Sequence, residues 1–217
     1  MKRHARLAAA LALWVPALSW AGAQQYEPLA ASVRTSMHSA IADRASPHLA
    51  FDSPDEGSQW LQDMSLRLTK RIPDEQARQD LLTTVHYESK RAGLDPQLVL
   101  GVIEVESKFR KYAVSHAGAR GYMQVMPFWV ELLGSNDHNL FALRTNLRYG
   151  CVILRHYIDV ERGDLTRALA RYNGSLGNAD YAKRVVQVWR TRWAWPATAV
   201  QRASHSTRPT RYMGDAN

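Results

Sequence analysis

The sequence contains a single cysteine, Cys151, among 217 residues. One thiol cannot form an intramolecular disulfide, so packing alone has to stabilise the fold. Cys151 belongs to the apolar run Cys-Val-Ile-Leu, which is typical of a small buried side chain. The chain also lacks His-Glu-x-x-His, paired Cys/His spacings and Gly-x-Ser-x-Gly. We therefore expect no metal site, no cofactor, and no serine or cysteine hydrolase centre.

Long apolar runs are absent except near the N-terminus, between Leu7 and Leu18. This run is shorter than the ~20 residues that a spanning helix needs, which disfavours a transmembrane anchor. Basic residues precede it and small residues follow it, as in a secretory signal peptide. The flanking residues are Lys2, Arg3 and Arg6 on one side and Ala21, Gly22 and Ala23 on the other. We expect a signal peptide over 1–23, Gln24 as the mature N-terminus, a periplasmic location and no stable membrane anchor.

Acidic residues are fewer than basic ones, 20 against 28, which gives a formal net charge of +8. The expected signal peptide carries three of the basic residues and no acidic one, so the mature chain keeps a charge of +5. A positive protein attracts anionic partners. Export argues against nucleic acid, so an anionic cell-wall polymer or a membrane surface fits better.

Alternating strand patterns and internal repeats are also absent, and the start and stop residues are those of helices. Residues 24–53 have weak periodicity and are expected to be a loosely structured lead-in. Residues 54–195 are expected to form one all-α domain, followed by a disordered basic tail over 196–217. The predicted helices cover 54–70, 73–91, 96–109, 123–133 with an interruption near Pro127, 145–162, 164–170 and 180–193.

Two glutamates, Glu104 and Glu106, end the third predicted helix and point to nearly opposite sides of it. Glu104 has Lys108 four residues on, which predicts a solvated surface pair. Glu106 has apolar neighbours, and partial desolvation would raise its pKa toward that of a general acid. From periodicity alone, a glutamate at the boundary of the helix that reaches water is at least as good a reading.

The segment after Glu106 favours the catalytic reading. The loop AVSHAGARG is small and polar, and its two glycines let backbone approach a ligand closely. A plain connector could also have this composition. Gln124 follows in the otherwise apolar stretch GYMQVMP, where its amide needs a backbone or ligand partner.

These residues resemble the transglycosylase domain of the family 1 (Slt-type) lytic transglycosylases. The resemblance rests on ESKF at 106–109, AVSHAGARGYMQVMP at 113–127 and ALARYNGS at 168–175, in the family's order. It implies a goose-type lysozyme-like fold, all-α, with several helices packed around a substrate groove. The positions that match the family's catalytic residues are Glu106, the acid, and Tyr172, which lies against its carboxyl group. The positions that match glycan-binding residues are Ser115, Met123, Gln124 and Asn173.

The sequence departs from the family pattern at Tyr122, where Leu is usual, and at Phe128 and Trp129, where small residues are usual. Tyr122 and Trp129 would either stack on sugars in the groove wall or pack in the core. The catalytic acid is unaffected by either outcome.

The resemblance implies cleavage of the MurNAc–GlcNAc β-1,4 bond of peptidoglycan glycan strands, leaving 1,6-anhydroMurNAc ends. Ordinary glycosidases use two carboxylates, and no second acid stands out beside Glu106. A hydrolytic goose-type lysozyme is the nearest alternative. A non-catalytic wall-binding module of a secretion apparatus is the other. The sequence leaves open whether secretion or conjugation machinery is a partner.

Overall fold

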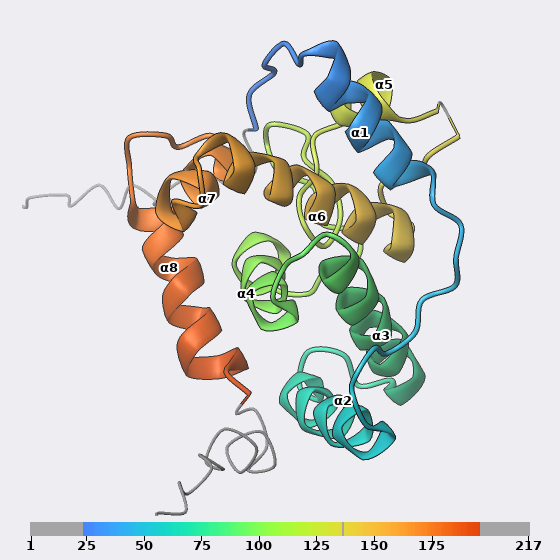
Figure 1. Cartoon of the computed structure of the whole chain (residues 1–217). Coiled ribbons are helices and arrows are strands. Elements are labelled where there is room, and N and C mark those ends of the chain that lie inside the picture. The colour runs from blue at the N-terminus through green and yellow to red at the C-terminus, as the bar shows by residue number, and fades with distance from the viewer. Residues whose placement is uncertain (1–23, 136, 196–217) are drawn as a thin grey trace, which may run out of the picture.

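The computed structural model describes residues 24–135 and 137–195 (Figure 1). The predicted signal peptide and basic tail lie outside these residues. The described chain is helical, with two isolated bridges in place of any sheet, so the all-α prediction is confirmed. The helices are α1 (Ala31–Ala42), α2 (Pro54–Leu68), α3 (Glu75–Arg91), α4 (Pro96–Ser107), α5 (Phe128–Leu133), α6 (Leu143–Val160), α7 (Leu165–Asn173) and α8 (Asp180–Val188), followed by the π-helix η1 (Trp189–Trp193).

Four of the predicted helix starts carry the side-chain caps that their sequences indicate. A serine or aspartate immediately before the helix accepts a hydrogen bond from a backbone N–H of the first turn, which would otherwise lack a partner. Proline also opens two of these helices, α2 and α4. The capping residues are Ser53 for α2, Asp74 for α3, Asp95 for α4 and Asp164 for α7.

Helix α4 lies in the middle of the molecule, with α3, α6, α7 and α8 around it (Figure 1). It is apolar around nearly its whole circumference, as expected for a helix buried on all sides. Gly101 lets η1 approach closely, because a Cβ atom there would lie 3.2 Å from the Cβ of Trp189. A polar residue at the C-terminal end of α4 is therefore held by a rigid, buried scaffold.

Three sequence expectations need correction. Residues 31–42 of the expected loose lead-in form α1, which buries Met37 and Ile41 against the rest of the domain. The helix expected from residue 123 begins only at Phe128, because Gln124 adopts a left-handed conformation with φ of 50°. The last helix changes to a π-helix at Trp189. In the first case tertiary packing outweighs weak local periodicity.

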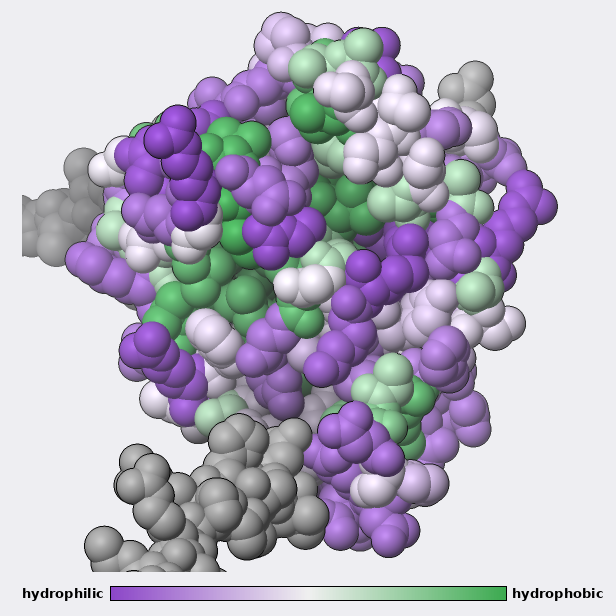
Figure 2. Space-filling view, viewed as in Figure 1, coloured by the Kyte–Doolittle hydropathy of each residue, from purple (hydrophilic) through white to green (hydrophobic). Residues whose placement is uncertain are grey.

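The face of the molecule seen in Figure 1 is mostly hydrophilic (Figure 2). Apolar residues gather in the middle of this face, between α8 and α3 and around α4. None of the helices in the described ranges is long and apolar enough to cross a membrane.

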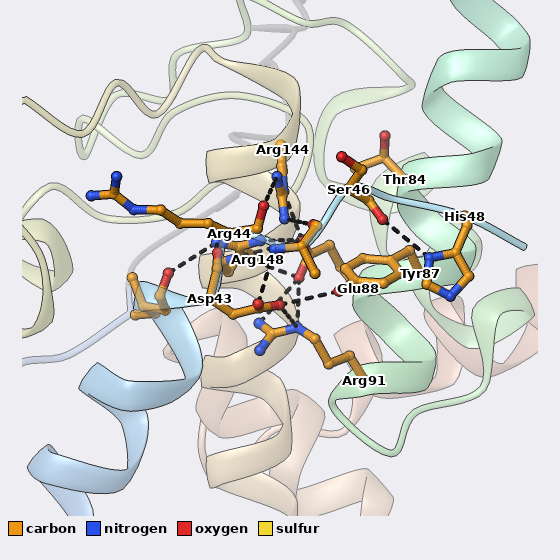
Figure 3. A network of polar contacts seen from close by, with 12 residues as sticks. Asp43, Arg44, Ser46, His48, Thr84, Tyr87, Glu88, Arg91, Arg144 and Arg148 are labelled. Carbon is orange, nitrogen blue, oxygen red and sulfur yellow. Dashed lines mark hydrogen bonds and ion pairs between the residues drawn. The ribbon is translucent and has the colours of Figure 1, made fainter. Parts of the chain in front are cut away.

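A buried carboxylate and several arginines attach α1 to the helices behind it (Figure 3). Glu88 is fully buried and pairs with Arg148 at 2.9 Å and Arg91 at 3.2 Å. The same arginines donate to backbone carbonyls at the end of α1, Arg91 to Ala40 and Arg148 to Ile41. These carbonyls have no partner within the helix, so the arginines act as its C-terminal cap.

Candidate functional site

A groove of about 870 Å³ runs past the C-terminal end of α4. One wall is the loop that follows α4, from Lys108 to His116. The other wall is one face of α8 and η1, where residues three or four apart point the same way. That face presents Tyr181, Arg184, Gln187, Val188, Thr191 and Arg192.

Glu106 lines this groove at the end of α4 and is only 6% exposed. The Tyr181 hydroxyl donates to Glu106 Oε1 at 2.6 Å. The other carboxylate oxygen, Oε2, is buried and has no hydrogen-bond partner in the described part of the chain. An unsolvated carboxylate oxygen favours the protonated form of the group.

Burial raises the pKa of Glu106 to about 7. The hydrogen bond from Tyr181 and the nearby positive charge of Arg184 both favour the ionised form, and they offset part of this rise. Near neutral pH the carboxyl group therefore exists in both protonation states. This is the property that lets one group donate a proton and later accept one.

Tyr172 lies near Glu106, since burial and then the charge of Glu106 raise the pKa of the Tyr172 hydroxyl, but no hydrogen bond joins the two side chains in the described residues. Its side chain is fully buried, and its hydroxyl donates to the carbonyl of Met123 at 2.8 Å. The tyrosine that bonds the carboxylate of Glu106 is Tyr181, which the sequence reasoning missed. A signal was present, because Tyr181 lies on the buried stripe of an amphipathic helix and a buried tyrosine hydroxyl needs a partner.

The predicted glycan-binding residues separate into two groups. Ser115, Gln124 and Asn173 line the groove with Glu106. Met123 does not, since its side chain is fully buried against Gly150, which corrects the expectation of a contact with substrate.

Two of the groove residues also hold the loop in shape. Gln124 Nε2 donates to the carbonyls of Ala113 and Gly121, at 3.2 and 2.9 Å. Ser115 Oγ accepts from the backbone N–H of Ala119 at 3.1 Å. The NH2 group of Gln124 is therefore committed to backbone carbonyls, and it holds the wall of the groove in shape.

The chain turns sharply after Glu106. Lys108 and Phe109 both adopt the left-handed conformation, with φ of 52° and 63°, which costs energy for residues other than glycine. The turn buries Phe109 beside Trp193, with ring centroids 5.4 Å apart, and leaves Lys108 exposed on the groove. Backbone strain of this kind is characteristic of functional sites.

Glu104 is not the solvated surface partner of Lys108 that its spacing predicts. It is 5% exposed and pairs with Arg71 at 2.6 Å and with Arg192. Its Oε2 accepts from Trp193 Nε1 at 2.8 Å. The prediction was wrong because it considered only residues on the same helix, whereas these partners come from the turn after α2 and from η1.

Two of the aromatic departures from the family pattern, Tyr122 and Trp129, lie in the core, and Phe128 is partly buried against it. Trp129 is 1% exposed and lies edge-on to Tyr157, and Tyr122 is also buried. Neither lines the groove described above. Of the two outcomes left open by the sequence, packing is the one observed. In the described ranges no group of His, Cys, Asp or Glu side chains is arranged to hold a metal ion.

The sequence is similar to those of known transglycosylases. A family profile described as "Transglycosylase SLT domain" matches residues 83–190. A transglycosylase of Enterobacteria phage PRD1 is 34% identical over 101 residues, which are 46% of this chain and 37% of that protein. Membrane-bound lytic murein transglycosylase F of Desulfosudis oleivorans is 34% identical over 109 residues, 48% of this chain and 24% of that protein.

A shorter and closer match covers part of the same region. Membrane-bound lytic murein transglycosylase C of Actinobacillus pleuropneumoniae serotype 5b is 54% identical over 46 residues, 21% of this chain and 13% of that protein. The chain therefore matches at most 37% of the length of these three curated relatives. The similarity is to a part of each relative.

Proposed function

The chain belongs to the Slt-type transglycosylase family, and from this premise we propose that it is a peptidoglycan lytic transglycosylase. It would cleave the MurNAc–GlcNAc β-1,4 bond of glycan strands and leave 1,6-anhydroMurNAc ends. Two helices and a loop line the groove beside Glu106. A groove of this extent suits a polymeric sugar better than a small ligand.

Glu106 would carry both proton transfers. As an acid it protonates the oxygen that links the two sugars, while the 2-acetamido group of MurNAc stabilises the positive charge that develops at C1. As a base the resulting carboxylate removes the proton of the C6 hydroxyl of the same sugar, whose oxygen closes onto C1. No water is consumed, and Glu106 ends in the protonated state in which it began. A pKa of about 7 suits both steps.

One observation carries the choice of intramolecular transfer over hydrolysis. Among the described residues that line the groove, the only carboxylates are Glu104 and Glu106. Glu104 is held by two arginines and by Trp193, so it is not available to act as a nucleophile or to activate water. A hydrolase with the usual pair of carboxylates would need a second free acid opposite Glu106.

The test is Glu106→Gln combined with mass spectrometry of digested peptidoglycan. The wild-type protein should release fragments with anhydro ends, which are lighter by one water than hydrolysed fragments. The variant should lose about 10²–10⁴-fold in turnover while still binding glycan. Glu131→Gln, at an exposed position on α5, is the matched control and should keep full activity.

Three outcomes contradict the proposal in different ways. Reducing ends in the wild-type digest would indicate the hydrolytic goose-type lysozyme. Binding without any product would indicate a wall-binding module. Near-normal turnover by Glu106→Gln would remove Glu106 from the mechanism.

We also propose a periplasmic site of action, after removal of residues 1–23. Cleavage after Ala23 would leave the contacts of Gln24 intact, since only its side chain is involved in them. Gln24 Nε2 donates to the Gln124 carbonyl at 3.3 Å, and its Oε1 accepts from the Met126 N–H at 3.2 Å. N-terminal sequencing of the exported protein would test this, and a start at another residue would contradict it. Secretion or conjugation machinery stays a predicted partner.

A further inference from the structure

The groove beside Glu106 is lined by more positive than negative side chains. Five lysine and arginine side chains and two carboxylates line it. Two of the five, Arg71 and Arg192, are paired with Glu104. The other three form no ion pair in the part of the chain that the structure describes, although the charge of Arg184 also acts on Glu106. We refer to these three residues, Lys108, Arg110 and Arg184, as the cationic rim.

The cationic rim stands on both walls of the groove. Lys108 and Arg110 follow Glu106 directly, and Arg184 lies one turn beyond Tyr181 on α8. All three are exposed, so their charges face solvent and any bound ligand. Positive charges gathered along one cleft reinforce one another and attract anions.

The substrate proposed above offers one kind of anionic group. Its sugar rings are neutral. Its negative charges are the carboxylates of the stem peptide or, where the peptide has been removed, the freed lactyl carboxylate of MurNAc. The lactyl branch lies on the sugar whose C1 reacts, so it must pass close to Glu106. We propose that the cationic rim binds these branch carboxylates, and that the enzyme thereby selects glycan strands whose branches are charged.

This inference rests on the proposed function for its choice of ligand, but a binding experiment tests it without turnover. Glu106→Gln protein would be titrated with three purified glycan fragments of equal length. The first carries native stem peptides, and the second carries the same peptides with their carboxylates amidated. The third has its peptides removed by an amidase, which leaves a free lactyl carboxylate.

We expect the native fragment to bind about 3- to 10-fold more tightly than the amidated one at low salt, with a smaller ratio at high salt. Lys108→Gln combined with Arg110→Gln, in the Glu106→Gln background, should reduce this ratio to about one. Binding of the amidated fragment should not change, which shows that the variant is folded. Lys183→Gln, an exposed residue of α8 outside the groove, is the matched control and should keep the ratio.

The three fragments also identify the source of the charge. Tight binding of the native fragment alone assigns the rim to the stem peptide. Equally tight binding of the amidase-treated fragment assigns it to a carboxylate at the lactyl position. Equal affinity for all three fragments overturns the inference. Such a result would leave the proposed function standing, which fails only if the wild-type protein releases no anhydro products from native peptidoglycan.

Discussion

At Glu106, burial and hydrogen bonding act in opposite directions on one carboxyl group. Burial raises its pKa to about 7, and Tyr181 and Arg184 keep it from rising further. The folded protein therefore keeps this proton between about pH 4.5 and 7, where the unfolded chain has lost it. The free energy of unfolding must then fall as the pH rises through that window. The site lowers the stability of the fold in order to hold an acid at neutral pH.

Removing the Tyr181 hydroxyl should raise the pKa of Glu106 further. Tyr181→Phe deletes a hydrogen bond that favours the ionised carboxylate, and such bonds are worth enough to shift a pKa by about one unit. The descending limb of the pH–activity profile should move from about pH 7 to about pH 8. Turnover below pH 7 should also fall, since the carboxyl group loses a contact that orients it.

The matched control is Tyr87→Phe. It also removes one hydrogen bond from a tyrosine hydroxyl to a carboxylate, that of Asp43, which lies beside the end of α1. Its profile should coincide with that of the wild-type protein. A Tyr181→Phe variant with lower activity and an unshifted profile would mean that Tyr181 affects only the structure of the groove.

At the scale of the elements, local sequence rules predicted where helices begin better than they predicted features that depend on distant contacts. Ser53, Asp74, Asp95 and Asp164 cap helices as expected, because a cap depends on residues only a few positions apart. Helix α1 was missed because its burial depends on partners in α5 and α6, far along the chain.

The same holds for the site: the residues that line it could be predicted from the sequence, but the contacts between its helices could not. Glu106 and three of the glycan-binding positions line one groove. The contact from Tyr181 and the pairing of Glu104 depend on how α8 and η1 pack against α4, and helix periodicity within one element carries no information about that packing.

Glu104 joins three elements, and its removal should therefore cost far more than a surface pair would. Glu104→Ala leaves the buried Trp193 Nε1 without an acceptor and frees Arg71 and Arg192. We expect the free energy of unfolding to fall by about 2–3 kcal/mol, less than for a fully buried pair because both arginines are partly exposed.

Chemical denaturation at pH 7 would measure the loss. Glu104→Gln keeps an acceptor for Trp193 and should lose less. Glu131→Ala, at an exposed position, should change the free energy of unfolding by under ~0.5 kcal/mol. A similarly small change for Glu104→Ala would restore the surface-pair interpretation.

At the scale of the whole molecule, the segment that matches the family is smaller than the folded unit. Residues 83–190 exclude α2, whose Trp60, Met64 and Leu68 are completely buried in the core. They also exclude Trp193, which is 1% exposed and bonds Glu104. Losing a buried side chain of this size costs about 2–5 kcal/mol, so these four together approach the entire stability of an ordinary domain.

A fragment of residues 83–190 should therefore fail to fold cooperatively. A fragment of residues 54–195 should fold, since it keeps α2 and η1, but with a lower melting temperature than 24–195. The difference arises because α1 buries Met37 and Ile41 and because the arginines around Glu88 lose their carbonyl partners at Ala40 and Ile41. Thermal unfolding followed by circular dichroism in both the far and near ultraviolet would compare the three fragments. A sharp transition for 83–190 would show that the groove and its acid need only the segment shared with the relatives, and that α2 and η1 are additions to a core that is stable without them.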